Sequence, residues 1–297
     1  MHRRTDNSIA EAGEGGKSPP MTPHPPAAGL PVDTYLAAIE RETRRFRECL
    51  ADADPGLRVP TCPDWSADDL LWHLGGEVQD FWAWVIARRP EVPEVYEEPE
   101  RPAERAGLIR HLDHAHEQLM LGLRNADPVD AAWSWIGDPA LHTVGFTVRR
   151  QAHEALIHRV DAELTVGAVT PLDSQLASDG VLECLEWMYG NLPGWAGWEH
   201  DGSRVLVHAA DTGHRVLVGL GRVTGRNPRT GDEIDQTELQ VLDRSVHGHA
   251  EADVTITAGA AALDLWLWHR GPAHPVEMEG DEALLDRLLG VLGQPID

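Results

Sequence analysis

The sequence is poor in lysine, cysteine and long apolar runs. Lys17 is its only lysine, and 49 acidic residues outnumber 25 basic ones, which gives a formal net charge of −24. Nucleic acids and anionic membranes are polyanions that repel such a chain, so we expect neither as a partner. No segment reaches the roughly 18 apolar residues of a membrane span. The first residues also lack the apolar core of a signal peptide.

The few cysteines indicate a reducing environment. Cys49, Cys62 and Cys184 are widely spaced and form no Cys-x-x-Cys motif. An odd number of cysteines without a secretion signal is typical of reduced thiols in a cytoplasmic protein. Cys62 lies in a loop flanked by prolines and is the best placed of the three for a catalytic thiol. Buried, unreactive thiols are the simpler interpretation.

The length and composition predict two domains after a tail. With 297 residues, 42% of them hydrophobic, the chain can build two cores of ordinary size. Residues 1–31 are rich in glycine and proline, and we predict a disordered tail there. Amphipathic helical patterns fill residues 32–190, and strand-like segments dominate residues 195–297. The expected fold is a four-helix bundle followed by a small α+β domain.

Local patterns predict the individual elements. Ser66 is a natural helix N-cap, with Asp69 as its capping-box partner. The glycine-rich segment 219–231 reads as a hairpin loop. Helices are expected at about 32–50, 66–88, 102–124, 141–166, 172–188, 259–268 and 281–292, and strands at 204–209, 214–218, 238–242 and 252–256.

The candidate site begins in the helix expected over 141–166. Glu154 and His158 lie one helical turn apart on one face, and Thr147, Gln151 and Asp161 continue the same stripe. A carboxylate and a neutral imidazole at this spacing can hold one divalent ion. A solvated polar face is the alternative interpretation. The zincin motif is excluded, because it needs histidines at its first and fifth positions.

A second motif lies upstream, in Val59-Pro60-Thr61-Cys62-Pro63-Asp64-Trp65-Ser66 and the following residues to His73 and Leu74. Together with the helix carrying Glu154 and His158 and with the mixed domain, it resembles the mycothiol-dependent maleylpyruvate isomerase family over about residues 32–292. That resemblance implies a DinB-like four-helix metal-binding domain and a sterol-carrier-protein-like C-terminal domain. It also implies that His73, Glu154 and His158 hold the metal.

The implied ligand set has a clear chemical meaning. Two imidazoles and one carboxylate leave a coordination position open, which is the arrangement of catalytic zinc. Zinc is therefore the metal we expect first, although nickel, cobalt and manganese also accept such ligands. A thiol that enters the open position loses its proton more easily. The resemblance implies that this thiol is mycothiol and that the reaction is cis–trans isomerisation of maleylpyruvate.

Four further residues are assigned roles. Arg270 lies in Leu265-Trp266-Leu267-Trp268-His269-Arg270-Gly271, which resembles the family segment with a functional arginine, and a dicarboxylate substrate suits a guanidinium. An arginine at a helix C-terminus is the alternative. Asp161 is a predicted partner of His158 or Arg159, or an exposed side chain. Gln151 and Thr147 are predicted to line the cofactor pocket.

Three functions follow from these expectations. The first is a metal- and mycothiol-dependent isomerase. The second is a mycothiol S-transferase that acts on another electrophile and does not need Arg270. The third is a metal-binding or small-molecule-binding protein without turnover. The expected partners are a small-molecule substrate and a low-molecular-weight thiol, and both a monomer and a homodimer remain open.

Overall fold

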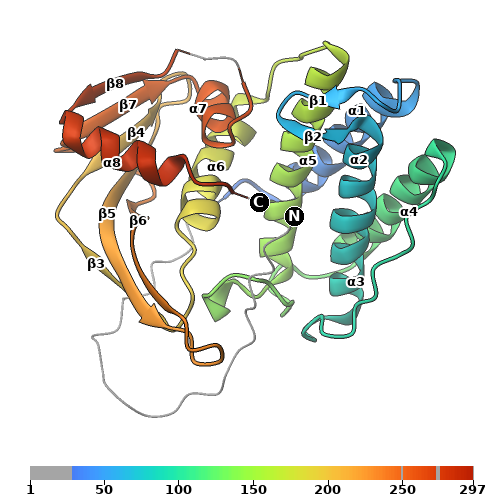
Figure 1. Ribbon diagram of the computed structural model, residues 1–297, viewed down its shortest axis with the longest axis horizontal. Coiled ribbons are helices and arrows are strands. Elements are labelled where there is room, and N and C mark those ends of the chain that lie inside the picture. Colours follow the sequence, from blue (N-terminus) through green and yellow to red (C-terminus); the bar gives the residue numbers. More distant parts are fainter. Residues whose placement is uncertain (1–28, 249, 272–274, 297) are drawn as a thin grey trace.

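The computed structural model describes residues 29–248, 250–271 and 275–296. Most of the predicted tail, residues 1–28, lies outside this range. An N-terminal helical domain is followed by a C-terminal domain that contains a sheet (Figure 1), which confirms the predicted fold class. The boundaries predicted for the domains, 32–190 and 195–297, stay a prediction. No helix among the described residues combines the length and apolarity that a membrane crossing needs.

The helical domain is built around the long helix α5. Its apolar core includes Phe46, Leu74, Leu112 and Leu156, all of which are fully buried. Helix α5 ends at Gly167, whose φ of 71° is a left-handed conformation that glycine adopts without strain. The helices of this domain are α1 (Val32–Ala51), α2 (Ala67–Trp72), α3 (Asp80–Arg88), α4 (Arg105–Arg124) and α5 (Val144–Val166).

The second expected helix contains a π-helical segment, η1, that the sequence pattern does not predict. Ser66 caps α2 as expected, because its Oγ accepts from the backbone N–H of Asp69 and the Asp69 carboxylate accepts in return. Residues His73–Gln79 then form η1, and α3 follows it directly without a break in the helical chain. Two glycines lie in η1, and a Cβ at Gly75 would lie 3.0 Å from the Cα of Leu112 on α4. Gly75 therefore permits close approach of the two helices.

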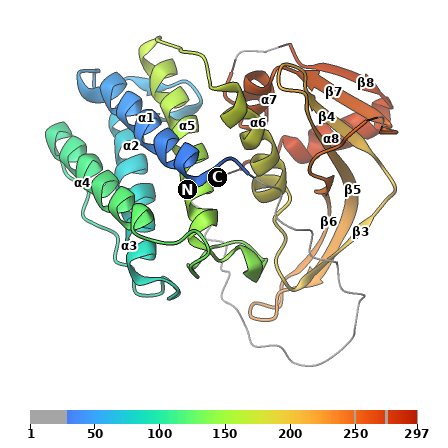
Figure 2. The same ribbon diagram turned by 180° about the vertical axis from the view of Figure 1, so that it is seen from behind.

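The C-terminal domain is a mixed sheet covered by helices. Its six strands include one parallel pair, β4 with β7, and the remaining pairs are antiparallel. Helix α6 lies between the sheet and α5 (Figures 1 and 2). The elements that follow α5 are α6 (Ser174–Glu183), the π-helix η3 (Cys184–Tyr189), β3 (Ala196–His200), β4 (Val205–Ala209), β5 (His214–Arg226), β6 (Glu233–Asp243), β7 (Val254–Ala258), α7 (Ala260–Leu267), β8 (Glu277–Gly280) and α8 (Glu282–Leu292). Two short strands, β1 (Arg58–Val59) and β2 (Cys62–Ser66), precede α2.

The hairpin predicted at residues 219–231 is confirmed, but its loop covers only residues 227–232. Strand β5 continues to Arg226 and pairs with β6 from Glu233 onward. Its glycines face large rings of the neighbouring strand: a Cβ at Gly221 would lie 2.4 Å from the Trp198 ring, and one at Gly219 would lie 2.5 Å from the His200 ring. These glycines therefore accommodate side chains of β3 and do not mark a turn.

Asp264 of α7 is buried against α6 without a hydrogen-bond partner. It is 1% exposed, and neither carboxyl oxygen has a partner among the described residues. A Cβ at Gly180 would lie 2.8 Å from both of these oxygens. Burial, and secondarily the charge of Glu183, raises the pKa of Asp264 well above its usual range. The folded state therefore holds this group as a neutral acid.

We expect Asp264→Asn to stabilise the fold near neutral pH, by at most about 1.4 kcal/mol for each pH unit above about 4, because the wild-type chain takes up a proton on folding and the amide does not. Asp264 is neutral in the folded chain and ionised in the unfolded chain, so unfolding releases a proton and wild-type stability falls as pH rises above about 4. The amide does not ionise, so the advantage of the variant should shrink toward about pH 4. Urea unfolding at both pH values measures this, with exposed Asp286→Asn as control. A variant that is less stable at neutral pH would contradict the assignment.

Candidate metal centre

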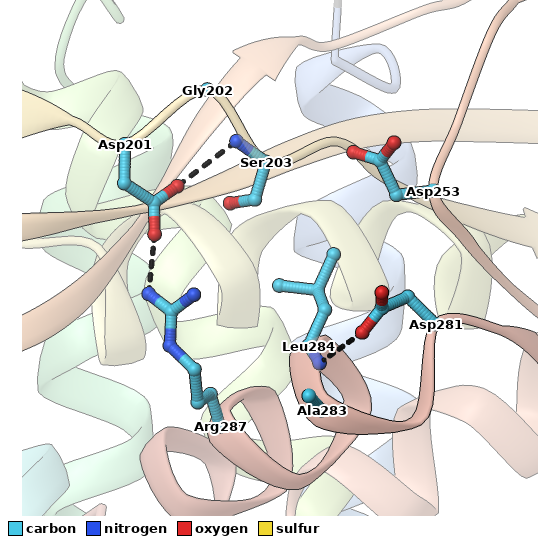
Figure 3. A pocket seen from close by; sticks show the side chains of 8 residues that line it. All are labelled: Asp201, Gly202, Ser203, Asp253, Asp281, Ala283, Leu284 and Arg287. Carbon is cyan, nitrogen blue, oxygen red and sulfur yellow. Dashed lines mark hydrogen bonds and ion pairs between the residues drawn. The ribbon is translucent and has the colours of Figure 1, made fainter.

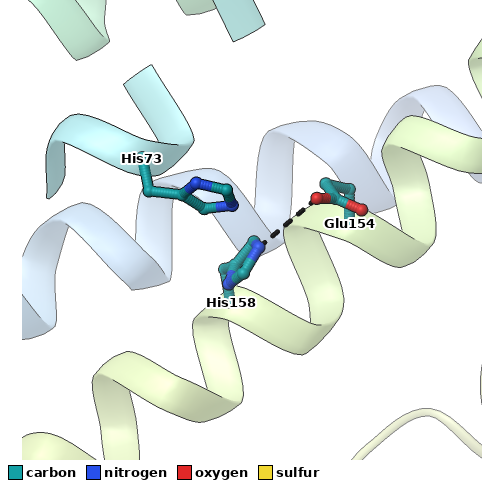
Figure 4. Close-up of side chains that lie close together, drawn as sticks. All are labelled: His73, Glu154 and His158. Carbon is teal, nitrogen blue, oxygen red and sulfur yellow. Dashed lines mark ion pairs between the residues drawn. The ribbon is translucent and has the colours of Figure 1, made fainter. Parts of the chain in front are cut away.

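Segment η1 and helix α5 bring the three predicted metal ligands together. His73, Glu154 and His158 each offer a ligand atom, and these atoms all lie within 4.8 Å of one another (Figure 4). The ring centroids of the two histidines are 4.7 Å apart, and Glu154 Oε1 is 3.3 Å from His158 Nε2. Zinc binds nitrogen and oxygen ligands at about 2.0–2.2 Å, so such separations suit a shared ion. The donor set therefore fits a divalent metal.

Each imidazole is oriented by a carboxylate on its far side. Nδ1 of His73 lies 2.8 Å from Glu77 Oε2, and Nδ1 of His158 lies 3.0 Å from Asp161 Oδ2. These bonds favour a proton on Nδ1 and leave Nε2 of each ring for a metal. Sequence reasoning gave Glu77 no role, although its spacing of four residues from His73 on a helix was the available clue.

The electrostatics of the two histidines differ. Burial lowers the pKa of His73 and outweighs its hydrogen bond to Glu77. Burial also opposes the charged form of His158, but its hydrogen bonds with Asp161 and Glu154 raise its pKa to about 8. Without an ion, His158 is therefore the ring that carries a proton near neutral pH. A metal must displace that proton, so its affinity falls as pH decreases.

Asp161 is the point where three segments meet. It is fully buried, and its carboxylate accepts from Thr61 Oγ1 at 2.5 Å and from Arg270 Nε and Nη2 at 3.0 and 3.2 Å. Burial raises the pKa of Asp161, but Arg270 and His158 overcome this and hold it at about 2. Asp161 thus contacts His158, one of the two partners expected for it, and it is not the exposed side chain of the alternative.

Arg270 is the residue of the C-terminal domain that lies beside the candidate metal centre. Its guanidinium binds Asp161 with two nitrogens, and Nη1 donates to the carbonyl of Trp268 at 2.8 Å. Nη2 also lies 3.8 Å from the Cys62 sulfur. The residue follows α7 closely, yet its main partner is a carboxylate of the other domain. Its role toward a substrate stays a prediction.

Thr147 and Gln151 are buried on the same face of α5 as Glu154. They are 0% and 2% exposed, and Thr147 Oγ1 and Gln151 Nε2 have no hydrogen-bond partner among the described residues. Buried polar atoms normally find partners, so each offers a bond to a group that binds there. Their role in cofactor binding stays a prediction.

Arg150 and Glu183 also belong to the centre, and sequence reasoning missed both. Nη2 of Arg150 donates to Glu154 Oε2 at 2.5 Å, and Nη1 donates to Glu183 on α6. Arg150 lies four residues before Glu154 on the same helix, which was a visible spacing. Glu183 has no such relation to the motif, because it reaches the site only through the packing of α6.

A hollow elsewhere on the C-terminal domain is lined by polar side chains, some of which pair with one another or cap a helix. It measures about 420 Å³ and lies between the turn after β3 and the start of α8 (Figure 3). Asp201 forms an ion pair with Arg287, and Asp281 accepts from the backbone N–H of Leu284 at 2.8 Å. The hollow shares no residue with the metal centre, and we assign it no role.

The helical bundle, the mixed domain and a two-histidine, one-carboxylate site between helices define a class of two-domain proteins with a candidate metal centre. Residues 36–163 match the model of the mycothiol maleylpyruvate isomerase N-terminal domain, and residues 175–287 match that of the C-terminal domain of the same proteins. The chain belongs to the mycothiol-dependent maleylpyruvate isomerase family.

A solved structure of that enzyme shares the fold. One crystal structure of the mycothiol-dependent maleylpyruvate isomerase has a TM-score of 0.50 at 14% identity, covering 84% of this chain and 93% of that one. A structure of a single-site mutant has a TM-score of 0.49 at 13% identity, covering 82% and 90%. A comparison with curated protein sequences finds no match. At this identity the likeness concerns the fold.

Proposed function

We propose that the protein is a divalent-metal- and mycothiol-dependent enzyme that acts as a maleylpyruvate-isomerase-like cis–trans isomerase. The observation that carries the proposal is the convergence of His73, Glu154 and His158, whose ligand atoms lie within 4.8 Å, in a chain of this family. A bound metal, with zinc expected first, supplies a positive charge that stabilises a thiolate. The chain itself supplies two oriented imidazoles and a carboxylate, and it leaves a position for the thiol.

The proposed reaction uses the thiol as a reversible nucleophile. The mycothiol thiolate adds to the cis double bond of the substrate, which places negative charge on the adjacent carbonyl oxygen. The former double bond is now single and rotates. Elimination then restores the double bond in the trans form and releases the thiolate, so no atom is gained or lost.

Arg270 is the residue we propose for the substrate's negative charge. Asp161 holds two of its nitrogens, and the guanidinium retains further N–H donors on its terminal nitrogens. Asp161 thereby acts as a positioning residue for both Arg270 and His158. Thr147 and Gln151 are proposed to bind the thiol, because each has a buried polar atom without a partner among the described residues.

A mycothiol S-transferase is the second candidate function. The observation that favours it is the bidentate pairing of Arg270 with Asp161, which already satisfies the charge expected to attract a dicarboxylate. In that case the thiolate attacks another electrophile and stays bonded to it. Arg270 would then serve only to hold Asp161.

The test combines metal analysis with thiol and substrate assays. We expect about one divalent metal per purified chain, because the site has a single ligand set. Mycothiol should bind the metal-loaded protein and not the chelator-treated protein, and only the former should convert maleylpyruvate to its trans isomer. Binding of metal and thiol without this conversion would favour the S-transferase. A purified chain that neither carries nor takes up a metal would contradict both enzymes.

A further inference from the structure

A buried ion-pair chain runs from the metal centre to the C-terminal domain. Its members are Glu154 on α5, Arg150 one turn earlier, and Glu183 on α6. Arg150 is 3% exposed and Glu183 is fully buried. The guanidinium also lies over the ring of Trp268, 5.1 Å from its centroid. A cation held by two carboxylates and an aromatic face is fixed in one position.

The fixed guanidinium of Arg150 gives the two Glu154 oxygens different partners. Oε2 accepts from Arg150 at 2.5 Å, whereas Oε1 lies 3.3 Å from His158 Nε2, on the side of the other ligands. A carboxylate can bind a metal through one oxygen or through both. With Oε2 held by Arg150, only Oε1 is directed to an ion. Two imidazoles and one oxygen then occupy three positions.

The charges of this chain also match a divalent ion. Arg150 balances one of the two carboxylates, so the chain carries one net negative charge in a buried place. A buried charge is costly unless it is paired, so a cation on the ligand side of Glu154 is favoured. Glu183 neutralises the charge of Arg150, so Arg150 does not repel a metal ion bound at Glu154.

We propose that Arg150, anchored by Glu183, is a positioning residue that keeps Glu154 a one-oxygen ligand and so preserves the coordination position for the thiol. The inference rests on the proposed function, because it presumes a metal at His73, Glu154 and His158. It extends that function by naming what keeps the site open. Without the cation, Glu154 is free to bind through both oxygens and to compete with an incoming thiol.

The test uses cobalt as a spectroscopic probe in the full-length protein. The variant Arg150→Met/Glu183→Gln removes a buried charge of each sign, so the remaining charge balance is kept. Arg149→Met/Asp179→Asn is the control, because this largely buried pair also joins α5 to α6 and does not touch Glu154. Arg150→Lys is a milder second variant that keeps the charge but loses the planar fork. Circular dichroism checks that each protein is folded.

We expect wild type and control to give the intense visible spectrum of four-coordinate Co²⁺. The Arg150 variants should give the weaker spectrum of a higher coordination number, and mycothiol should bind them roughly 10–100-fold more weakly. If both Arg150 variants had the spectrum and the thiol affinity of wild type, this inference would be overturned and the proposed function would still stand. The same losses in the control would also overturn it. Absence of Co²⁺ binding by wild type would instead overturn the proposed function on which it rests.

Discussion

Replacing His158 with alanine is expected to abolish stoichiometric metal binding and thiol-dependent turnover. His158 is 6% exposed, and its Nε2 lies 3.3 Å from Glu154 Oε1, so alanine at this position removes one of the three proposed ligand atoms. Loss of a ligand's hydrogen-bond partner costs roughly 10–100-fold in metal affinity or activity, and loss of the ligand itself should cost more. Metal analysis after dialysis, together with turnover under saturating mycothiol, measures both effects.

A surface histidine provides the control for this substitution. His114 on α4 is exposed, and His114→Ala should retain wild-type metal content and turnover. The fold should tolerate His158→Ala, because Asp161 keeps its bonds to Thr61 and Arg270. If His158→Ala kept about one tightly bound metal per chain, the ligand set would be wrong.

Part of this centre was predictable because a helix places residues four apart on one face. Glu154 and His158 follow that rule, and the pattern alone was compatible with a shared ligand face or with a solvated polar face. His73 lies on another helix, so only the family resemblance connected it with them. The π-helical turn over His73–Gln79 was not predictable from apolar spacing, because that spacing continues through α2 and α3 without a break.

The contacts that complete the site depend on packing between distant segments. Arg270 and Asp161 are 109 residues apart in sequence, and Arg150 and Glu183 are 33 apart. No periodicity in either helix specifies such a partner. The glycines of β5 illustrate the same limit, because their neighbours Trp198 and His200 lie on another strand. Local composition there predicted a loop, and the cross-strand packing determined a strand.

Replacing Asp161 with alanine is expected to give the largest loss of stability. The change leaves the guanidinium of Arg270, 13% exposed, without its carboxylate, and Thr61 without its acceptor. Removing one partner of a buried ion pair costs about 3–5 kcal/mol. His158 also loses the partner of its Nδ1, so metal affinity should fall roughly 10–100-fold. Urea unfolding and metal competition with a chelator measure the two effects separately.

The pH dependence of stability gives a further signature of the same carboxylate. The pKa of Asp161 is about 2 in the folded chain against a usual value of 3.8, so the folded state favours the charged form. Its contribution is fully present above about pH 4 and is lost as pH falls toward 2. Asp161→Ala should therefore lose less stability than wild type between these values.

A double substitution separates the structural role of Asp161 from its role at the metal. Asp161→Asn/Arg270→Met removes both charges, so much of the lost stability should return because no buried charge is left unpaired. Metal affinity should stay low, because an amide does not stabilise the proton on His158 Nδ1 as a carboxylate does. Asp113→Ala, which breaks an exposed pair with Arg47, should cost only about 0.2–1 kcal/mol. If the double variant regained both stability and metal affinity, Asp161 would serve only to join the two domains, and His158 would not depend on it.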